Sequence, residues 1–240
     1  MHVLDYFQRI YVINLAHRHD RRREMARQLD EIGLTFDSPG VCLFEAIRPD
    51  SADGFPSIGA RGCFLSHLGI LQDARKRRLE RILILEDDLN FAPDFPAAMN
   101  AALATLKQVD WSIFYGGYAM ETEPQPQNGE VVVLANSTDS IKTTHFVAFR
   151  GQAITDAVEF LETVMARPPG HPKGGPMHVD GAYGWFRYEF PSKATWLAVP
   201  QLGYQRSSRT DIHPLQWFDR IPGIRWAIEW LRQMKNRPKR

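Results

Sequence analysis

The feature that most constrains the fold is a short apolar segment that ends abruptly in three acids. Arg81-Ile82-Leu83-Ile84-Leu85 is followed at once by Glu86-Asp87-Asp88. An apolar run this short, bounded by charges, is typical of a central strand buried on both faces. Strands of that kind occur in sheets that helices cover on both sides. The sequence therefore predicts an internal strand whose carboxyl end presents acidic side chains.

Other segments predict that strands and helices alternate along the chain. A β-branched run at residues 10–15 precedes Met25, Leu29 and Ile32, which recur at helical spacing. We expect further strands at 111–115, 131–134, 145–149 and 195–199, and helices at 93–106 and 152–165. Such alternation favours an α/β fold with a largely parallel sheet.

Helix starts and loops are less well marked. We expect Asp20 to cap the helix after the first strand, and Ser66 to cap a helix that carries Leu68, Leu71 and Ala74. Residues 34–60 give weak signals. Residues 166–176 are rich in Pro and Gly and predict a loop, either an active-site lid or a plain surface excursion.

The charge balance argues against nucleic acid as a partner. Lys and Arg number 29 and Asp and Glu 28, a net charge of +1, whereas nucleic-acid binders usually carry a larger basic excess. The end of the chain differs, because residues 220–240 hold seven basic groups and one acid. That tail has a charge of +6, which leaves −5 for residues 1–219.

The basic tail also has an apolar stripe. Ile221, Ile224, Ile228, Leu231 and Met234 recur at steps of three or four residues. This pattern predicts a basic amphipathic helix at 219–240, after a domain at 1–218. The helix is suited either to an anionic membrane surface or to ordinary packing on the domain.

The remaining composition indicates a reducing compartment. The two cysteines, Cys42 and Cys63, are too few for a disulfide framework. We see no signal peptide at the start and no apolar run near the roughly 20 residues that span a bilayer. We therefore expect a cytoplasmic protein, with peripheral attachment to the inner face of the cytoplasmic membrane left open.

The acidic strand end has a chemical interpretation of its own. Three adjacent carboxylates repel one another, and ligands of open α/β sheets bind outside the carboxyl ends of strands. A hard divalent cation with oxygen ligands would neutralise the cluster. Glu86 and Asp88 can point to one side of an extended chain and share that cation. The competing interpretation is a solvated turn.

Six motifs in order over residues 10–212 resemble glycosyltransferase family 25. That family includes bacterial lipopolysaccharide and lipooligosaccharide sugar transferases and the catalytic domains of collagen galactosyltransferases. The motifs are Val12-Ile13-Asn14-Leu15 with Asp20-Arg21, Gly62-Cys63-Phe64-Leu65-Ser66-His67, Ile84-Leu85-Glu86-Asp87-Asp88, Tyr115-Gly116-Gly117, His178-Val179-Asp180, and Gln205 with Thr210-Asp211-Ile212. The chain departs from the family's pattern at Ala16, His145-Phe146 and Thr210.

The resemblance implies a GT-A-like single domain with a Rossmann-like, largely parallel sheet flanked by helices. It also implies inverting transfer of a sugar from a nucleotide diphosphate donor, with galactose or glucose on UDP favoured and Mn²⁺ or Mg²⁺ assisting. The acceptor would be a saccharide or lipid-linked saccharide in lipopolysaccharide or surface polysaccharide biosynthesis. The alternative is a non-catalytic glycosyltransferase-like protein that binds a nucleotide or glycan and docks at a membrane.

The same resemblance suggests a role for each candidate residue. Asp180 is the candidate catalytic base and Asp87 the alternative, while Glu86, Asp88 and His178 are candidate metal ligands. Candidate donor-binding residues are Asn14, Asp20, Arg21, Ser66, His67, Gly116, Gly117, Gln205 and Asp211. Asp20 and Ser66 could instead be helix caps only. Trp185, Trp196 and Trp217 could stack on sugars, although packing is their commoner role.

Overall fold

The computed structural model describes residues 3–126 and 129–206 as two sheets and the helices around them. The predicted helix at 219–240 and the candidate residue Asp211 lie outside the described residues. The larger sheet has seven strands in the order β2-β1-β3-β7-β5-β8-β6, and β4 pairs with β9 in a separate ribbon. The strands are β1 (Arg9–Asn14), β2 (Val41–Glu45), β3 (Arg81–Glu86), β4 (Leu89–Phe91), β5 (Ile113–Ala119), β6 (Val132–Ala135), β7 (Lys142–Arg150), β8 (Thr195–Ala198) and β9 (Gly203–Gln205).

Five strands of the large sheet point in the same direction. β1 is parallel to β2 and β3, and β5 is parallel to β8. β7 runs antiparallel between β3 and β5, and β6 runs antiparallel to β8 at the edge. The predicted α/β fold with a largely parallel sheet is confirmed, with β7 as the internal exception.

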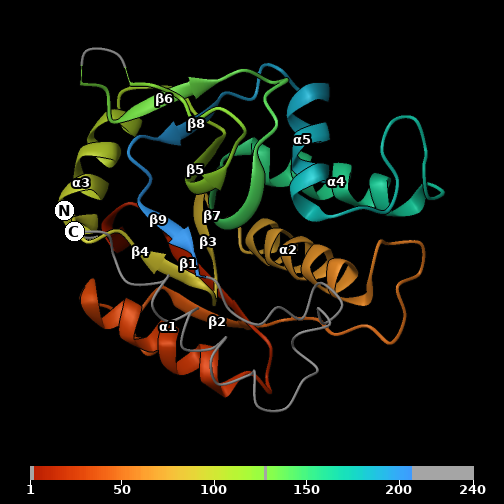
Figure 1. The fold of residues 1–240 in the computed structure, drawn as a ribbon, viewed down its shortest axis with the longest axis horizontal. Coiled ribbons are helices and arrows are strands. Elements are labelled where there is room, and N and C mark those ends of the chain that lie inside the picture. The colour runs from red at the N-terminus through yellow and green to blue at the C-terminus, as the bar shows by residue number, and fades with distance from the viewer. Residues whose placement is uncertain (1–2, 127–128, 207–240) are drawn as a thin grey trace.

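Helices cover both faces of this sheet (Figure 1). They are α1 (His19–Glu31), α2 (Ile58–Lys76), α3 (Phe95–Leu106), α4 (Gln152–Ala166) and α5 (Val179–Glu189), after a short 3₁₀ helix at Val3–Asp5. Alternate strand residues enter opposite cores, as the pleat requires. On β3, Ile82 and Ile84 join the core formed with α2, α4 and α5. Leu83 and Leu85 join the core formed with α1 and α3. Both faces of β3 are therefore buried, as its apolar sequence predicted.

Both predicted helix caps are wrong. The helix predicted from Ser66 begins at Ile58, and the Ser57 hydroxyl caps it by accepting a hydrogen bond from the Ala60 amide at 3.0 Å. Ser66 lies inside α2, where its hydroxyl donates to the Gly62 carbonyl at 2.7 Å. The helix predicted from Asp20 begins at His19, after Arg18. Asp20 therefore lies inside the first turn, where its carboxylate pairs with the Arg18 guanidinium at 2.8 Å.

Two elements that place the site have weak sequence signals. β2 lies in the segment where we expected little structure, and its side chains are only partly buried. α5 contains two glycines and four aromatic residues, all poor helix formers. Its buried residues Val179, Ala182, Tyr183 and Phe186 show that packing stabilises it instead. The predicted loop at 166–176 is confirmed between α4 and α5. Within the described ranges, no helix combines the length and apolar character needed to cross a membrane.

The correction at the start of α2 gives a stability prediction. Replacing Ser57 with Ala removes the oxygen that satisfies the Ala60 amide. We expect the free energy of unfolding in urea to fall by about 1 kcal/mol. Ser140→Ala, at an exposed serine, is the control and should change it by less than about 0.5 kcal/mol. Equal effects of the two substitutions would contradict the capping role.

Candidate functional site

The candidate site lies where β1 and β3 end beside each other. These strands are parallel neighbours, and Ile13 pairs with Glu86. Asn14 therefore lies close to the acids that follow β3. The ribbon of β4 and β9 folds back over the same end, because Leu89 pairs with Gln205. Three of the six sequence motifs, those of Asn14, Glu86 and Gln205, thus meet at one edge of the sheet.

Asp87 is fully engaged with residues from β1 and α1. One carboxylate oxygen accepts from the Asn14 amide at 2.6 Å, and the other accepts from the Arg21 guanidinium at 2.9 Å. Both side chains of the ion pair are nearly buried, at 11% and 8% exposure. Burial raises the pKa of Asp87, and Arg21 and Asn14 oppose that rise. Asp87 therefore ties the acidic turn to the first strand and helix.

Asp88 is nearly buried, and only one of its two carboxylate oxygens has polar partners. Its Oδ2 lies 3.4 Å from the Arg21 guanidinium and accepts a hydrogen bond from Gln205 at 3.3 Å. Its Oδ1 is buried without a hydrogen-bond partner. Burial and the neighbouring Glu86 carboxylate raise the pKa of Asp88 to about 7. An orphaned carboxylate oxygen in this setting is suited to hold a proton or a cation.

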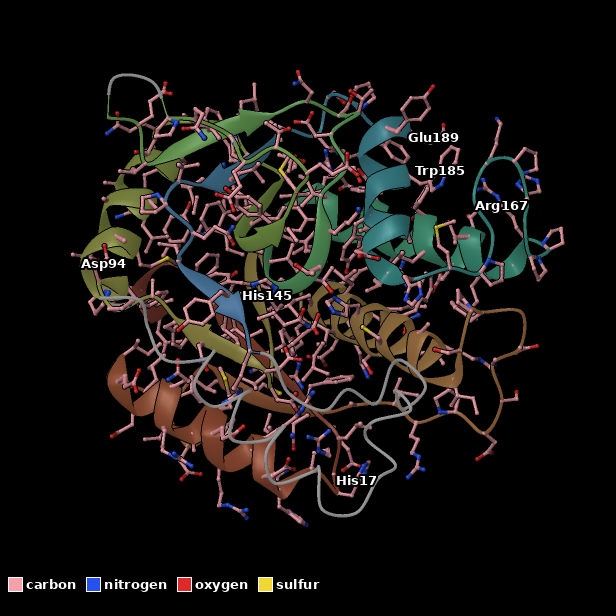
Figure 2. All side chains as sticks on the ribbon, in the orientation of Figure 1. His17, Asp94, His145, Arg167, Trp185 and Glu189 are labelled. Atoms are coloured by element: carbon pink, nitrogen blue, oxygen red, sulfur yellow. The ribbon has the colours of Figure 1, made fainter. Side chains whose placement is uncertain are left out.

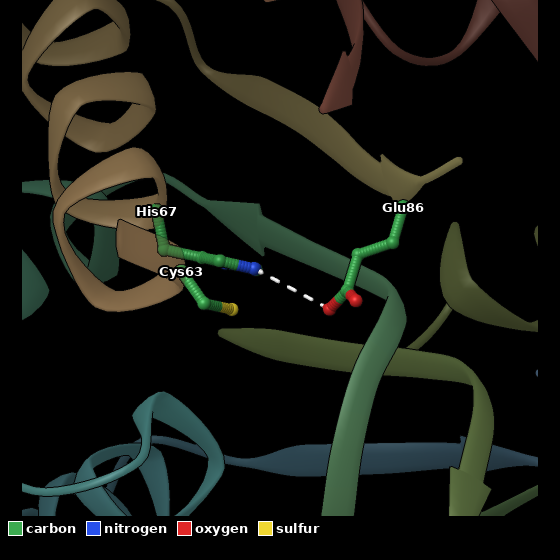
Figure 3. Close-up of side chains that lie close together, drawn as sticks. All are labelled: Cys63, His67 and Glu86. Atoms are coloured by element: carbon green, nitrogen blue, oxygen red, sulfur yellow. Dashed lines mark ion pairs between the residues drawn. The ribbon is translucent and has the colours of Figure 1, made fainter. Parts of the chain in front are cut away.

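The Glu86 side chain points toward His67 and Cys63 of α2 (Figure 3). Its Oε1 accepts from the Thr144 hydroxyl at 2.6 Å and lies 3.6 Å from Nε2 of His67. Burial works to raise the pKa of Glu86, but His67, Thr144 and His145 outweigh it and lower the pKa. Cys63, one helical turn before His67, completes a group whose ligand atoms lie within 4.8 Å of one another.

The predicted metal set is only partly assembled. Among the described residues, the group of three metal-binding side chains with adjacent ligand atoms is Cys63, His67 and Glu86. Glu86, Asp88 and His178 do not form such a group in that part of the chain. Glu86 and His178 do line one common pocket. The assignment of Asp88 and His178 as ligands stays a prediction.

Asp180 lies in the first turn of α5 and approaches β7. Its carboxylate accepts hydrogen bonds from the Thr143 amide at 3.1 Å and from the Gly181 amide at 2.8 Å. Thr143 has a φ of 66°, a left-handed conformation that a β-branched residue rarely adopts. Backbone strain of this kind clusters at functional sites. Here it directs an amide toward the Asp180 carboxylate.

Three hollows adjoin one another across the site. The strand-end pocket runs between β1, β2 and the start of α2, and includes Ile13, Arg21, Arg48, Cys63 and Glu86. The central pocket includes Cys63, Glu86, His178, Asp180 and Gln205. The wide cleft, about 900 Å³, lies along α5 and the loop before β7, and includes His178, Asp180 and Trp185. The strand-end pocket and the central pocket share Cys63 and Glu86. The central pocket and the wide cleft share His178 and Asp180.

The other candidate donor-binding residues are more scattered. Ser66 lines the strand-end pocket, but its hydroxyl is buried between the Gly62 carbonyl and the Ile47 amide. Asp20 is exposed beside Arg18. Gly116 and Gly117 lie in β5, where a methyl group would meet the Phe146 ring at 2.6 Å and the Gly203 carbonyl oxygen at 2.5 Å. Close packing thus requires both glycines.

Several residues of the site were not predicted from the sequence. The Thr143 amide donates to Asp180, and the Thr144 hydroxyl donates to Glu86. The Tyr183 hydroxyl lies 3.2 Å from Nδ1 of His67. Arg206 donates from its side chain to the Asp87 carbonyl at 2.8 Å. Arg48 is exposed and lines the strand-end pocket. Thr143 and Thr144 stand next to the quoted departure His145-Phe146, the nearest signal that could have found them.

Comparison with known proteins confirms the predicted resemblance. Residues 56–163 match the model of a family described as "Glycosyltransferase family 25 (LPS biosynthesis protein)". The chain is 31% identical over 140 residues to procollagen galactosyltransferase 1-B of Xenopus laevis, covering 50% of this chain and 23% of that protein. It is 30% identical over 129 residues to a human protein named inactive glycosyltransferase 25 family member 3, covering 46% and 22%. The chain is thus similar to proteins of glycosyltransferase family 25, and the match spans less than a quarter of these relatives' lengths.

A solved structure is also similar. It is a glycosyltransferase involved in the glycosylation of the major capsid of PBCV-1, with a TM-score of 0.49 and 15% sequence identity. The match covers 84% of this chain and 93% of that chain.

The buried Asp88 carboxylate gives a prediction about pH. Its folded pKa of about 7 is above the ordinary 3.8, so its contribution to stability is present at low pH and is lost as pH rises through that interval. Asp88→Asn removes this loss. Between pH 4 and pH 8, we expect the free energy of unfolding of the variant to rise by up to roughly 4 kcal/mol relative to that of the unsubstituted protein.

Urea unfolding at several pH values, with chelator present, measures this difference. Asp94→Asn is the matched control, because Asp94 is exposed before α3 and makes no capping hydrogen bond. Its difference from the unsubstituted protein, measured at the same pH values, gives the baseline for a carboxylate at the surface. An Asp88→Asn difference that does not vary with pH would contradict the burial of a charged Asp88.

Proposed function

We propose that this protein is an inverting glycosyltransferase that moves a sugar from a nucleotide diphosphate donor to a saccharide acceptor. The observation that carries the proposal is the row of three adjoining hollows. A single displacement needs the donor and the acceptor on opposite sides of the reacting carbon. The strand-end pocket and the wide cleft provide two such sides, with Glu86 and Asp180 between them.

The strand-end pocket suits the nucleotide diphosphate. Its walls include the apolar side chains of Ile13, Ile47 and Ile58, which can pack on a base or ribose. The guanidinium groups of Arg21 and Arg48 lie in the same pocket and match the charge of phosphates. Arg21 already balances Asp87 and Asp88, so Arg48 is the better placed cation for the donor.

Asp88 and Glu86 offer two oxygen ligands for a divalent cation at the diphosphate, although they do not form a three-residue ligand group with His178 among the described residues. The orphaned Oδ1 of Asp88 and the partly exposed Glu86 are oxygen donors of the kind that Mg²⁺ and Mn²⁺ prefer. Asp88 and Glu86 would hold the ion, with His178 as a further candidate ligand. When bound, such an ion supplies charge neutralisation for the departing diphosphate. Gln205 keeps Asp88 in place through its hydrogen bond.

Asp180 is suited to act as the base. It lines both the central pocket and the wide cleft, so an acceptor hydroxyl in the cleft can reach its carboxylate. As the acceptor oxygen bonds to the anomeric carbon, the bond to the diphosphate breaks and Asp180 takes the hydroxyl proton. The amides of Thr143 and Gly181 hold the carboxylate in position. Asp87, the alternative base, already accepts hydrogen bonds on both oxygens.

The wide cleft suits a saccharide. Trp185 and Tyr188 are stacked edge to face at 5.9 Å along α5, and Tyr188 is 58% exposed. Aromatic faces of this kind pack on sugar rings. Figure 2 shows Trp185 and Glu189 on α5 toward the edge of the molecule, where a long acceptor could extend. The buried Arg187 fixes the cleft's opposite wall by donating to the carbonyls of Asn136 and Asp139.

The setting of the reaction is inferred from the relatives' names. The description of the family names lipopolysaccharide biosynthesis, and one relative is named a procollagen galactosyltransferase. We infer a UDP-galactose or UDP-glucose donor and a lipopolysaccharide or other surface polysaccharide acceptor, lipid-linked or free. A cytoplasmic site, with attachment to an anionic membrane surface, would fit that setting.

Separate measurements of donor binding and transfer test the proposal. We expect Asp180→Asn to bind the donor normally and to lower transfer by roughly 10²–10⁴-fold, because the acceptor proton has no base. Donor binding is measured as a rise in melting temperature with UDP, GDP and CMP sugars in Mn²⁺. Transfer is measured with the labelled donor that binds, onto truncated lipopolysaccharide and onto procollagen.

Glu159→Gln, at an exposed site on α4, is the control and should leave both readouts unchanged. Near-normal transfer by Asp180→Asn with both substrates saturating would contradict the base. No melting shift with any donor would contradict the transferase and favour a non-catalytic glycan-binding relative.

A further inference from the structure

A second ligand set shares Glu86 with the oxygen ligands proposed above and adds sulfur and nitrogen. Cys63 and His67 are four residues apart on α2, so both side chains point from one face of the helix. Figure 3 shows them directed at Glu86, which ends β3. The sulfur, the imidazole nitrogen and a carboxylate oxygen all lie within 4.8 Å of one another. Elements distant in sequence thus bring three ligand types to one point.

The imidazole of His67 provides independent evidence of a missing partner. His67 is completely buried, and its Nε2 has no hydrogen-bond partner. Oε1 of Glu86 is 3.6 Å away, within range of an ion pair when His67 is protonated but too long for a normal hydrogen bond. A buried polar atom without a partner costs roughly 1–3 kcal/mol. A cation between His67 and Glu86 would remove that cost.

The contacts behind these ligands resemble those that orient metal-binding side chains. Nδ1 of His67 lies 3.2 Å from the buried Tyr183 hydroxyl, which can accept a hydrogen bond from Nδ1–H and so leave the Nε2 lone pair facing Glu86. Glu86 is held in turn by the Thr144 hydroxyl at 2.6 Å. Metal-binding histidines usually donate their second ring N–H in this way, and metal-binding carboxylates are usually hydrogen-bonded.

We propose that Cys63, His67 and Glu86 form a binding site for a borderline-soft divalent cation of the zinc class. One thiolate, one imidazole and one carboxylate is a ligand set that suits Zn²⁺ and Co²⁺ better than Mg²⁺. Bonds of about 2.0–2.3 Å require the three ligand atoms to move together by roughly 1 Å. The Cys63 thiol loses its proton to solvent as the metal–sulfur bond forms.

The site leaves one coordination position that faces the hollows described above. Cys63 and Glu86 line both the strand-end pocket and the central pocket. Three protein ligands with an open fourth position is the arrangement of catalytic rather than structural zinc sites. The open position would accept water or an oxygen of a bound ligand. The proposal does not depend on sugar transfer, because the metal binds in the absence of donor and acceptor.

Cobalt titration tests the site directly, because a cobalt–thiolate bond gives a charge-transfer band in the near ultraviolet. We expect the metal-free protein to develop this band with one equivalent of Co²⁺ and to lose it when Zn²⁺ is added. Cys63→Ser should abolish the band. Cys42→Ser is the matched control, because Cys42 is the chain's other cysteine and lies on β2, and it should keep the band.

Two further variants separate loss of the ligand from loss of the fold. His67→Gln should weaken Co²⁺ binding at least 10-fold while urea unfolding remains cooperative. Asp88→Asn should retain the band, because Asp88 is outside this ligand set. Absence of the band in the unsubstituted protein would overturn the proposal, as would a band that persists in Cys63→Ser. If the unsubstituted protein shows the cobalt band but transfers no sugar, the proposed function would be contradicted and the metal site would stand.

Discussion

The site depends on the buried ion pair between Arg21 and Asp87. Three acids at the end of a buried strand would repel one another and resist desolvation. The Arg21 guanidinium lies 2.9 Å from Asp87 and 3.4 Å from Asp88, and Asn14 holds the other oxygen of Asp87. This pairing satisfies Asp87, whereas Oδ1 of Asp88 has no hydrogen-bond partner and Glu86 lines the strand-end and central pockets. Removing one partner of such a pair typically costs about 3–5 kcal/mol.

The acids of the site have different surroundings, which supports the different roles proposed for them. Asp87 is neutralised by Arg21, Asp88 is buried with one free oxygen, and Glu86 faces the imidazole of His67. Asp180 comes from a different element and is held by backbone amides. Four carboxylates within one region therefore have four environments. That diversity allows one group to hold a cation while another takes a proton.

Much of this arrangement could be predicted from the sequence, because its signals are local. The buried strand, its acidic end and the order of motifs bring Asn14, Arg21, Glu86 and Gln205 to one edge of the sheet. The start of α2 could not be predicted, because Ser57 lies in a stretch rich in Gly, Pro and Ser and Ser66 looked equally suitable as a cap. The contact of Thr143 depends on β7 packing against α5, and the contact of Tyr183 depends on α5 packing against α2, which no local pattern encodes.

The central claim is that the carboxyl ends of β1 and β3 bind a nucleotide diphosphate with a divalent cation on Asp88. A crystal structure with UDP and Mn²⁺, with an anomalous difference map that locates the manganese, tests it most directly. The account predicts one anomalous peak within bonding distance of Oδ1 of Asp88 and of the diphosphate, with uridine in the strand-end pocket. A peak away from Asp88, or uridine in the wide cleft, would contradict it.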